Sequence, residues 1–254
     1  MRYLIKFSYD GTKFHGFQWK NDVKSVQKTL EDDLSKLLAT KIVIKGSGRT
    51  DAGVHALGQC AHFDYDGKFT NKEVYELNKI LNNEIVIKNC KKVGNNFHAR
   101  HSVKKKTYVY KINNGNYRKD YEGYYFQCRY PLDIRKMRKA SKLFVGVHDF
   151  HNFVSGFRVD YTTHIYKINI KKYGDIVLLK FVGAGFYRYM VRHLVGALID
   201  VGRGKVDINV IENMLENEKL NKKLSIVPAD GLYLKKIEFI MQNVVFFNEI
   251  NKKK

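Results

Sequence analysis

The sequence predicts a mixed α+β fold built from two halves of similar make-up. Segments that alternate apolar and polar residues, as strands do, are interleaved along the whole chain with segments of helical apolar spacing. The 254 residues, 44% of them hydrophobic, are enough to bury a substantial core as one large domain or two compact ones. With two prolines and no low-complexity stretch, the chain shows no long linker.

Strand-like alternation recurs on both sides of the chain's midpoint. The predicted strands are residues 2–9, 41–45, 58–65, 84–88, 107–112, 164–170, 176–182 and 232–239. Strands of this kind, mixed with helices rather than separated from them, favour layers of helix on sheet.

Apolar spacing behind capping residues predicts the helices. One apolar stripe starts at Val26 behind Ser25, whose hydroxyl is suited to an N-cap. A second follows Thr70, which has Glu73 three residues on, in the register of a capping box. Three more helices are predicted: one behind Asp133 with the stripe Ile134, Met137 and Phe144, one over 190–202 that ends at Gly202, and a shorter one over 208–215.

The basic run Lys104, Lys105 and Lys106 is the best boundary between the halves. It divides the chain into an N-terminal α+β half, 1–104, and a C-terminal α+β half, 105–254. Strands and helices alternate on both sides, which predicts two α+β sandwiches whose sheets join across the boundary.

The composition favours a polyanionic partner. Lys and Arg number 46 against 25 Asp and Glu, a net charge of +21 with a pI near 9.7, so counterion release and steering favour nucleic acid. Tyr, Phe and Trp make up 13% of the chain and offer faces for unstacked bases, although most aromatic residues belong to a core. A biased coding composition, rich in Lys, Asn and Ile, is the alternative source of the charge.

Neither disulfides nor a membrane segment is expected. Cys60, Cys90 and Cys128 are odd in number and far apart, which fits a reducing cytoplasm. The N-terminus lacks the apolar core of a signal peptide, and no apolar run is long enough to span a bilayer. We expect a cytoplasmic protein with no membrane partner.

Cofactors and metals have little support in the sequence. His98 with His101, and His148 with His151, have HxxH spacing, but no cysteine lies close to either pair and Asp149 is the one adjacent carboxylate. The sequence contains neither a Walker loop nor a GxGxxG after a strand. We therefore expect chemistry without a cofactor or a metal.

The segment GSGRTDAGVHALGQ, residues 46–59, is the most informative part of the chain. Glycines at 46, 48 and 53 permit backbone conformations closed to other residues, so the chain can turn sharply and display Arg49 and Asp51 at a strand end. There Asp51 could act as nucleophile or general base, with Arg49 keeping it ionised. The alternative is a glycine-rich hairpin with a solvated Arg–Asp pair.

Two further constellations lie in the second half. In KKKTYVYKI, 104–112, alternation puts Tyr108 and Tyr110 on one face of a strand that follows a lysine triplet, an arrangement suited to a flipped nucleotide or to a core strand. Near the start of the apolar segment 185–202, Arg188 and Arg192 lie one helical turn apart. A guanidinium there needs a partner, and a surface salt bridge is the simplest one.

These motifs resemble the tRNA pseudouridine synthase A family. The resemblance rests on GSGRTDAGVHALGQ and on further blocks in the same order: SYDGTKFHGFQ (8–18), SVQKTLEDDL (25–34), FHAR (97–100), the Tyr108 strand, HDFHNF (148–153), MVRHLVG (190–196) and ADGLYL (229–234). It covers nearly the whole chain. It implies a pseudouridine synthase fold, in which two ferredoxin-like halves share a mixed, mostly antiparallel central sheet, and a homodimer that binds tRNA.

The resemblance also implies roles for site residues. Uridine is isomerised by breaking the C1′–N1 bond, turning the uracil and rejoining it through C5, for which a carboxylate suffices. Asp51 matches the family's nucleophile, which attacks the sugar or the base or assists glycal formation. Tyr108 matches a tyrosine that stacks on the target base and helps remove the C5 proton, Arg192 an arginine that pairs with the aspartate, and Arg49 a residue that displaces the target nucleotide. The implied target is the anticodon stem-loop of tRNA, at nucleotides 38, 39 and 40.

Other functions remain open from the sequence. An RNA-binding or chaperone protein could keep this shape without catalysis, and Asp51 would then be dispensable. The histidine pairs could serve a metal-dependent nuclease, which a chelator would inhibit. A pseudouridine synthase could also modify another RNA, such as rRNA.

Overall fold

The protein folds around one large sheet with helices at both ends. In the computed structural model, which describes residues 1–216 and 224–240, the strand order is β4-β1-β3-β10-β5-β9-β8-β7. The strands are β1 (Arg2–Tyr9), β3 (His55–Asp64), β4 (Ile85–Val93), β5 (Val103–Asn113), β7 (Gly146–Asp149), β8 (Thr162–Tyr173), β9 (Ile176–Gly183) and β10 (Leu232–Phe239). Two short strands extend it: β2 (Lys45–Gly46) pairs with β3, and β6 (Phe126–Gln127) pairs with β5. The predicted α+β class is confirmed.

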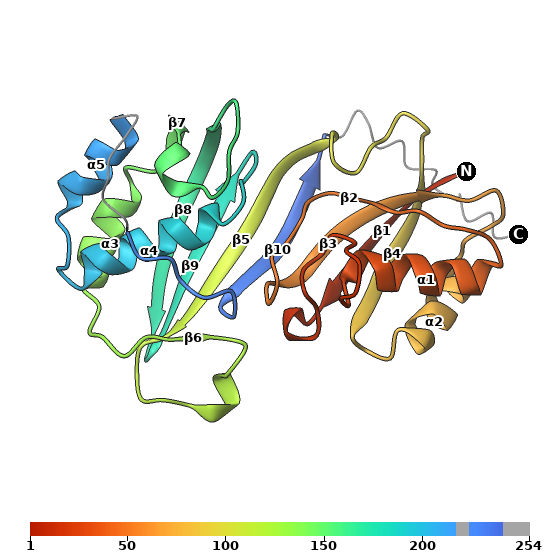
Figure 1. The fold of residues 1–254 in the computed structure, drawn as a ribbon, viewed down its shortest axis with the longest axis horizontal. Coiled ribbons are helices and arrows are strands. Elements are labelled where there is room, and N and C mark those ends of the chain that lie inside the picture. Colours follow the sequence, from red (N-terminus) through yellow and green to blue (C-terminus); the bar gives the residue numbers. More distant parts are fainter. Residues whose placement is uncertain (217–223, 241–254) are drawn as a thin grey trace, which may run out of the picture.

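The two halves join through the last described strand. β10 pairs in parallel with β3 and antiparallel with β5, so a C-terminal segment lies between the N-terminal strands and β5 (Figure 1). Among the described strands, the pairs β3–β10 and β5–β6 are parallel and the other pairs are antiparallel. The sheet is therefore mixed and mostly antiparallel, as expected. The division at residue 104 stays a prediction; β5 runs through it without interruption.

The predicted helices are present with their capping residues. They are α1 (Val26–Leu38), α2 (Asn71–Ile80), α3 (Ile134–Ser141), α4 (Met190–Gly202) and α5 (Ile208–Glu216). Ser25, Thr70 and Asp133 each accept a hydrogen bond from a backbone N–H of the first turn, and Thr70 and Glu73 form the predicted capping box. Helices α1 and α2 lie over one end of the sheet, and α3, α4 and α5 over the other (Figure 1).

Three local predictions need correction. The segment 41–45 is not a strand except at Lys45, because side chains of α1 take its backbone N–H groups: Ile42 N donates to Ser35 Oγ at 2.8 Å and Ile44 N to Glu31 Oε1 at 3.0 Å. Phe144 lies beyond the end of α3, although it is fully buried. The short strands β2, β6 and β7 were not predicted, since two to four residues are too few to show a period.

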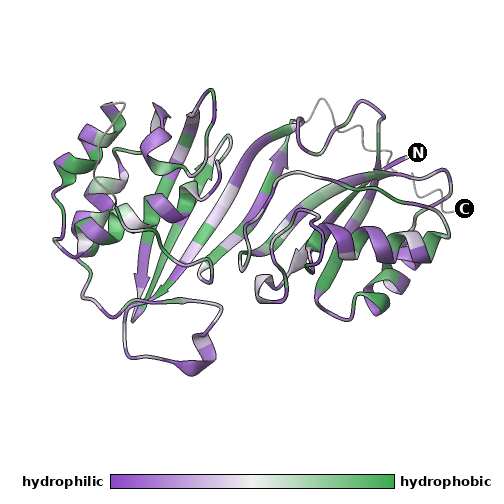
Figure 2. Cartoon of the chain, viewed as in Figure 1, coloured by the Kyte–Doolittle hydropathy of each residue, from purple (hydrophilic) through white to green (hydrophobic). Residues whose placement is uncertain are grey.

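One continuous core runs beneath both halves. Its largest cluster of buried hydrophobic residues draws on β1, β3 and α1 at one end and on β9 and α4 at the other. Apolar and polar residues alternate along the long strands, whereas α4 is apolar along most of its length (Figure 2). Cys60, Cys90 and Cys128 are free thiols. Among the described residues, no helix is long and apolar enough to cross a membrane.

Candidate active site

Asp51 lies in the loop between β2 and β3, where backbone and side-chain hydrogen bonds hold the chain. The hydroxyls of Thr50 and Tyr9 lie 2.7 Å apart and share a hydrogen bond, and the carbonyl of Thr50 accepts one from Phe17 N at 3.0 Å. The carbonyl of Asp51 accepts from Val54 N at 3.1 Å, which closes the turn. Residues of β1 and of the segment that precedes α1 therefore hold the loop in place.

The loop glycines are required for two different reasons. Gly53 has φ +79°, a left-handed conformation that favours glycine. Gly46 and Gly48 have no positive φ, so they do not use the conformational freedom that glycine allows at these positions. A Cβ at Gly46 would lie 2.4 Å from the ring of Phe17, and one at Gly48 would lie 2.7 Å from Nζ of Lys106. Glycine is required at these two positions because a side chain would not fit, not because the backbone conformation demands it.

The carboxyl of Asp51 lies in a shielded, positively charged setting. Burial raises its pKa above the ordinary value, and the charges of Arg192, Arg188 and Lys20 partly offset that rise. Neither arginine forms a direct ion pair with Asp51 in the structure, whose ion pairs lie elsewhere in the described chain. The cations therefore act on Asp51 across space, which leaves its oxygens available to a substrate.

Tyr108 lies on the neighbouring strand β5 and is 7% exposed. Its ring meets that of Phe186 edge to face, with the centroids 5.2 Å apart. Burial, with the charges of Tyr9 and Asp51 adding to it, raises the pKa of Tyr108 well above that of a free tyrosine. The structure thus brings Tyr108, from the C-terminal half, into the electrostatic reach of Asp51, from the N-terminal half.

Tyr110 is a core residue, which is one of the two roles that the sequence allowed for this face of the strand. It is fully buried, and its hydroxyl donates to the carbonyl of Pro228 at 2.9 Å. One face of β5 therefore carries both the core residue Tyr110 and the candidate site residue Tyr108.

The start of α4 brings two arginines to the site. Tyr189, the N-cap of the helix, has φ 60°, an uncommon left-handed conformation for a tyrosine. The guanidinium groups of Arg188 and Arg192 lie 4.9 and 4.6 Å from the centre of its ring. Nε of Arg192 also donates to the carbonyl of Val227 at 2.7 Å. The predicted surface salt bridge is absent from the described residues; the partners are an aromatic ring and a carbonyl.

Arg49 is placed differently from the other candidates. Its side chain is exposed and, within residues 1–216 and 224–240, forms no hydrogen bond or ion pair. The structure does not join it to Asp51, although a single residue, Thr50, separates the two in sequence. Arg49 is thus available to an external partner.

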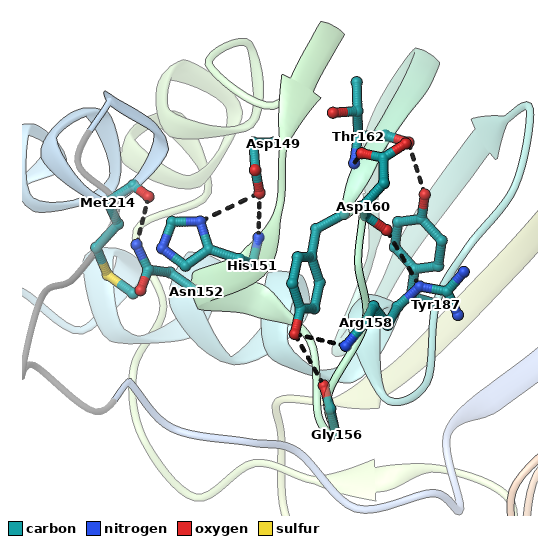
Figure 3. Close-up of polar contacts among 10 residues, drawn as sticks. Asp149, His151, Asn152, Gly156, Arg158, Asp160, Thr162, Tyr187 and Met214 are labelled. Carbon is teal, nitrogen blue, oxygen red and sulfur yellow. Dashed lines mark hydrogen bonds and ion pairs between the residues drawn. The ribbon is translucent and has the colours of Figure 1, made fainter.

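The histidine pairs have local partners. Nδ1 of His98 accepts a hydrogen bond from the backbone of Arg100 at 3.1 Å, and Nδ1 of His151 lies 3.1 Å from the carboxylate of Asp149 (Figure 3). Among the described residues, no group of three or more His, Cys, Asp or Glu side chains is placed to hold a metal ion.

The loop between β7 and β8 runs from the second histidine pair toward the site. Arg158 stacks on Tyr187, 4.2 Å from its ring centre, and donates to the carbonyl of Asp160 (Figure 3). The backbone N–H of Ser155 donates to the carbonyl of Arg188 at 3.1 Å. The loop is therefore anchored at the start of α4.

Several residues around Asp51 were not singled out from the sequence. Tyr9, Phe17 and Gly16 support the loop from the segment SYDGTKFHGFQ, and Gly16 has φ +96° with Thr50 O 3.0 Å from where its Cβ would lie. The signal was a second glycine-containing turn after a strand. Tyr189 and Lys106 gave no separate signal, because a tyrosine between arginines and a lysine among lysines look ordinary.

Comparisons with known proteins agree with one another. The family model described as tRNA pseudouridine synthase matches residues 5–102 and 140–239. A Lactobacillus helveticus protein named tRNA pseudouridine synthase A is 39% identical over 241 residues, which cover 92% of each chain. Proteins of the same name from Lactobacillus acidophilus and Mycoplasmoides gallisepticum are each 37% identical, covering 99% and 93% of this chain and 96% and 90% of their own.

Proposed function

Because the chain belongs to the tRNA pseudouridine synthase family, we propose that it isomerises uridine to pseudouridine at nucleotides 38, 39 and 40 of the tRNA anticodon stem-loop, with Asp51 as the nucleophile. The family makes the chain an isomerase that acts as a pseudouridine synthase. The observation that supports the choice of residues is that Asp51 and Tyr108, from opposite halves, come within electrostatic reach of each other where β3, β10 and β5 are neighbours in the shared sheet.

Asp51 has the properties that the first chemical step requires. Breaking the C1′–N1 bond leaves an electron-poor sugar carbon and an electron-rich base, and a carboxylate can add to either. Partial burial weakens the hydration of the carboxylate and raises its pKa, and the charges of Arg192, Arg188 and Lys20 favour its ionised form and offset part of that rise. Arg192 is held by Val227 and Tyr189, and its charge acts on Asp51 across space.

Tyr108 supplies the surface for the uracil. Its ring lies against Phe186 and within electrostatic reach of Asp51, so a base stacked on it would bring its sugar toward the carboxylate. The raised pKa keeps its hydroxyl protonated at neutral pH, which favours stacking over proton abstraction as its part before the bond breaks. The resemblance to the family implies a second role for Tyr108, which is to help remove the C5 proton at the last step.

The remaining residues bind and unstack the RNA. Arg49, exposed beside Asp51, displaces the target nucleotide from the stem. The net charge of +21 binds the phosphate backbone without reading sequence, so that tRNA shape and stem flexibility select the target. The enzyme acts as a homodimer in the cytoplasm, needs no cofactor, and one tRNA touches both subunits.

Tritium release tests this proposal directly. Unmodified tRNA labelled at C5 of uridine loses its label only when that hydrogen is replaced as the base is rejoined. We expect release by the wild-type protein, with and without a chelator, and none above background by Asp51→Asn. Mapping of pseudouridine in the product should place it at nucleotides 38 to 40.

Each alternative has its own outcome in that assay. If the wild-type protein binds tRNA and releases no label, a non-catalytic RNA-binding role gains support. Release of tritium from labelled rRNA and not from tRNA would show that the substrate is rRNA. A chelator that abolished activity would point to the histidine pairs instead of Asp51.

A further inference from the structure

Lys106 lies on the same face of β5 as Tyr108, two residues before it, and touches the Asp51 loop. Strand alternation puts both side chains on that face, and β5 keeps its register with β9 through this stretch. Nζ of Lys106 occupies the space of a Cβ at Gly48, 2.7 Å from where that atom would lie. The loop therefore crosses β5 with Gly48 over Lys106, while Asp51 comes within electrostatic reach of Tyr108.

The amine of Lys106 has no partner within the described chain. No hydrogen bond or ion pair engages it in residues 1–216 and 224–240, and Nζ is not sealed from solvent. The adjacent Lys105, on the opposite face, pairs with Glu238 at 3.3 Å. Burial, with the charge of Arg100 adding to it, lowers the pKa of Lys106 to about 8. A shielded cation without a counterion opposes folding, so this site gains most from a bound anion.

We propose that Lys106 binds a phosphate oxygen of the RNA backbone next to the target nucleotide and thereby holds the strand over Asp51 and Tyr108. The inference rests on the proposed function and adds a positioning residue to it. Asp51 then faces the sugar, Tyr108 the base and Lys106 the phosphate, so the three side chains match the three parts of one nucleotide. Glycine at 48 keeps the backbone low enough for the phosphate to reach the amine.

The charge of Lys106 gives this contact its own pH dependence. Arg100, from the turn after β4, is the charged group that acts on its amine, Gly48 of the loop lies against it, and Tyr108 lies on the same face of its own strand. Its cross-strand neighbours, Gly183 on β9 and Ile237 on β10, carry no charge. Arginine stays charged, and burial puts the pKa of Tyr108 far above this range. Between pH 7 and 9, Lys106 is the group of this set that loses its charge.

The test compares Lys106→Met and Lys106→Arg with Lys105→Met, which removes an equal charge from the other face of β5. The dissociation constant of unmodified tRNA is measured at pH 7 and pH 9 and over a range of salt concentrations. We expect wild-type binding to weaken severalfold at pH 9, the Arg variant to bind equally well at both, and the Met variant to bind about tenfold more weakly at pH 7 with no further loss. Its salt slope should fall by about one.

The control and the overturning results are distinct. Lys105→Met should keep the wild-type dependence on pH. If Lys106→Met binds tRNA as Lys105→Met does at both pH values, the proposal is wrong. Failure to fold is not expected, because the Met variant removes a shielded charge and should melt no lower than the wild type. Absence of pseudouridine in every tRNA tested with the wild-type protein would instead overturn the proposed function.

Discussion

The loop that carries Asp51 and the start of α4, which carries Arg188 and Arg192, bring opposite charges to the site by different means. The loop is fixed through its backbone, by hydrogen bonds to Thr50 and Asp51 and by close contacts at its glycines. The arginines reach the site on long side chains, which rest on the ring of Tyr189. Asp51 is placed by the backbone of its loop, whereas the two arginines are placed by contacts of their side chains, and Arg192 also by its hydrogen bond to Val227.

This difference suits an enzyme that must admit a large, bent substrate. A nucleophile has to stand within a fraction of an ångström of its target, and rigid backbone provides that. The guanidinium group of Arg188, which rests on the ring of Tyr189, can shift toward phosphates as RNA arrives, because stacking tolerates sliding. Variants of the Asp51 loop and variants of the arginines can therefore separate effects on the chemical step from effects on RNA binding.

The largest effect is expected from Asp51→Asn. It should lower the isomerisation rate at least about a thousandfold, because it removes the proposed nucleophile, and it should also raise the melting temperature at neutral pH. Burial raises the folded-state pKa of Asp51, so its ionisation favours the unfolded chain as pH rises through that range. Differential scanning calorimetry should show the gain shrinking as pH falls toward the ordinary pKa of an aspartate.

A lower melting temperature for the Asn variant at neutral pH would show that Asp51 stabilises the loop and would weaken the contrast. A control is Asp66→Asn, an exposed aspartate of the same half, for which neither change is expected.

Replacing the ring of Tyr108 should have the next largest effect. A stacked base contributes about 1–3 kcal/mol to binding, so Tyr108→Leu should bind tRNA roughly tenfold more weakly or worse. Tyr108→Phe keeps the ring and should bind within about twofold of the wild type. Filter binding measures both, and equal weakening by the two variants would argue against stacking.

Arg192→Gln tests the cationic side. Since the charge of Arg192 lowers the pKa of Asp51, its removal should shift the acidic limb of the pH–rate profile to higher pH and reduce the rate by about tenfold at neutral pH. Arg203→Gln, at the far end of α4, where that arginine stacks on Tyr130, should leave the profile unchanged. An unshifted limb in Arg192→Gln would mean that Arg192 does not act on Asp51.

The smallest effect is expected from Thr50→Val, which loosens the rigid side. It removes the hydroxyl that bonds Tyr9 at 2.7 Å in a buried place, and such a loss costs about 1–2 kcal/mol. We expect a lower denaturant midpoint and a severalfold lower turnover with little change in tRNA affinity. Weaker tRNA binding at unchanged turnover would contradict the view that the Asp51 loop contributes to the chemical step rather than to binding.

Much of the fold was predictable because its signals are local. The period of two in β10 and the apolar stripe of α4 gave their bounds, and Ser25, Thr70 and Asp133 capped their helices as predicted. The segment 41–45 was not predictable, because alternation cannot tell pairing with a strand from bonding to side chains of α1.

The sequence by itself determined the α+β class, the capped helices, the basic charge and the motif around Asp51, since each depends on residues close together in the chain. The tertiary structure decided what lies near Asp51. It set β10 between β3 and β5, put Gly48 over Lys106 and exposed Arg49 while Arg192 acts on Asp51 across space. Burial and the contacts between distant segments, which set these pKa values, exist only once the two halves share one sheet.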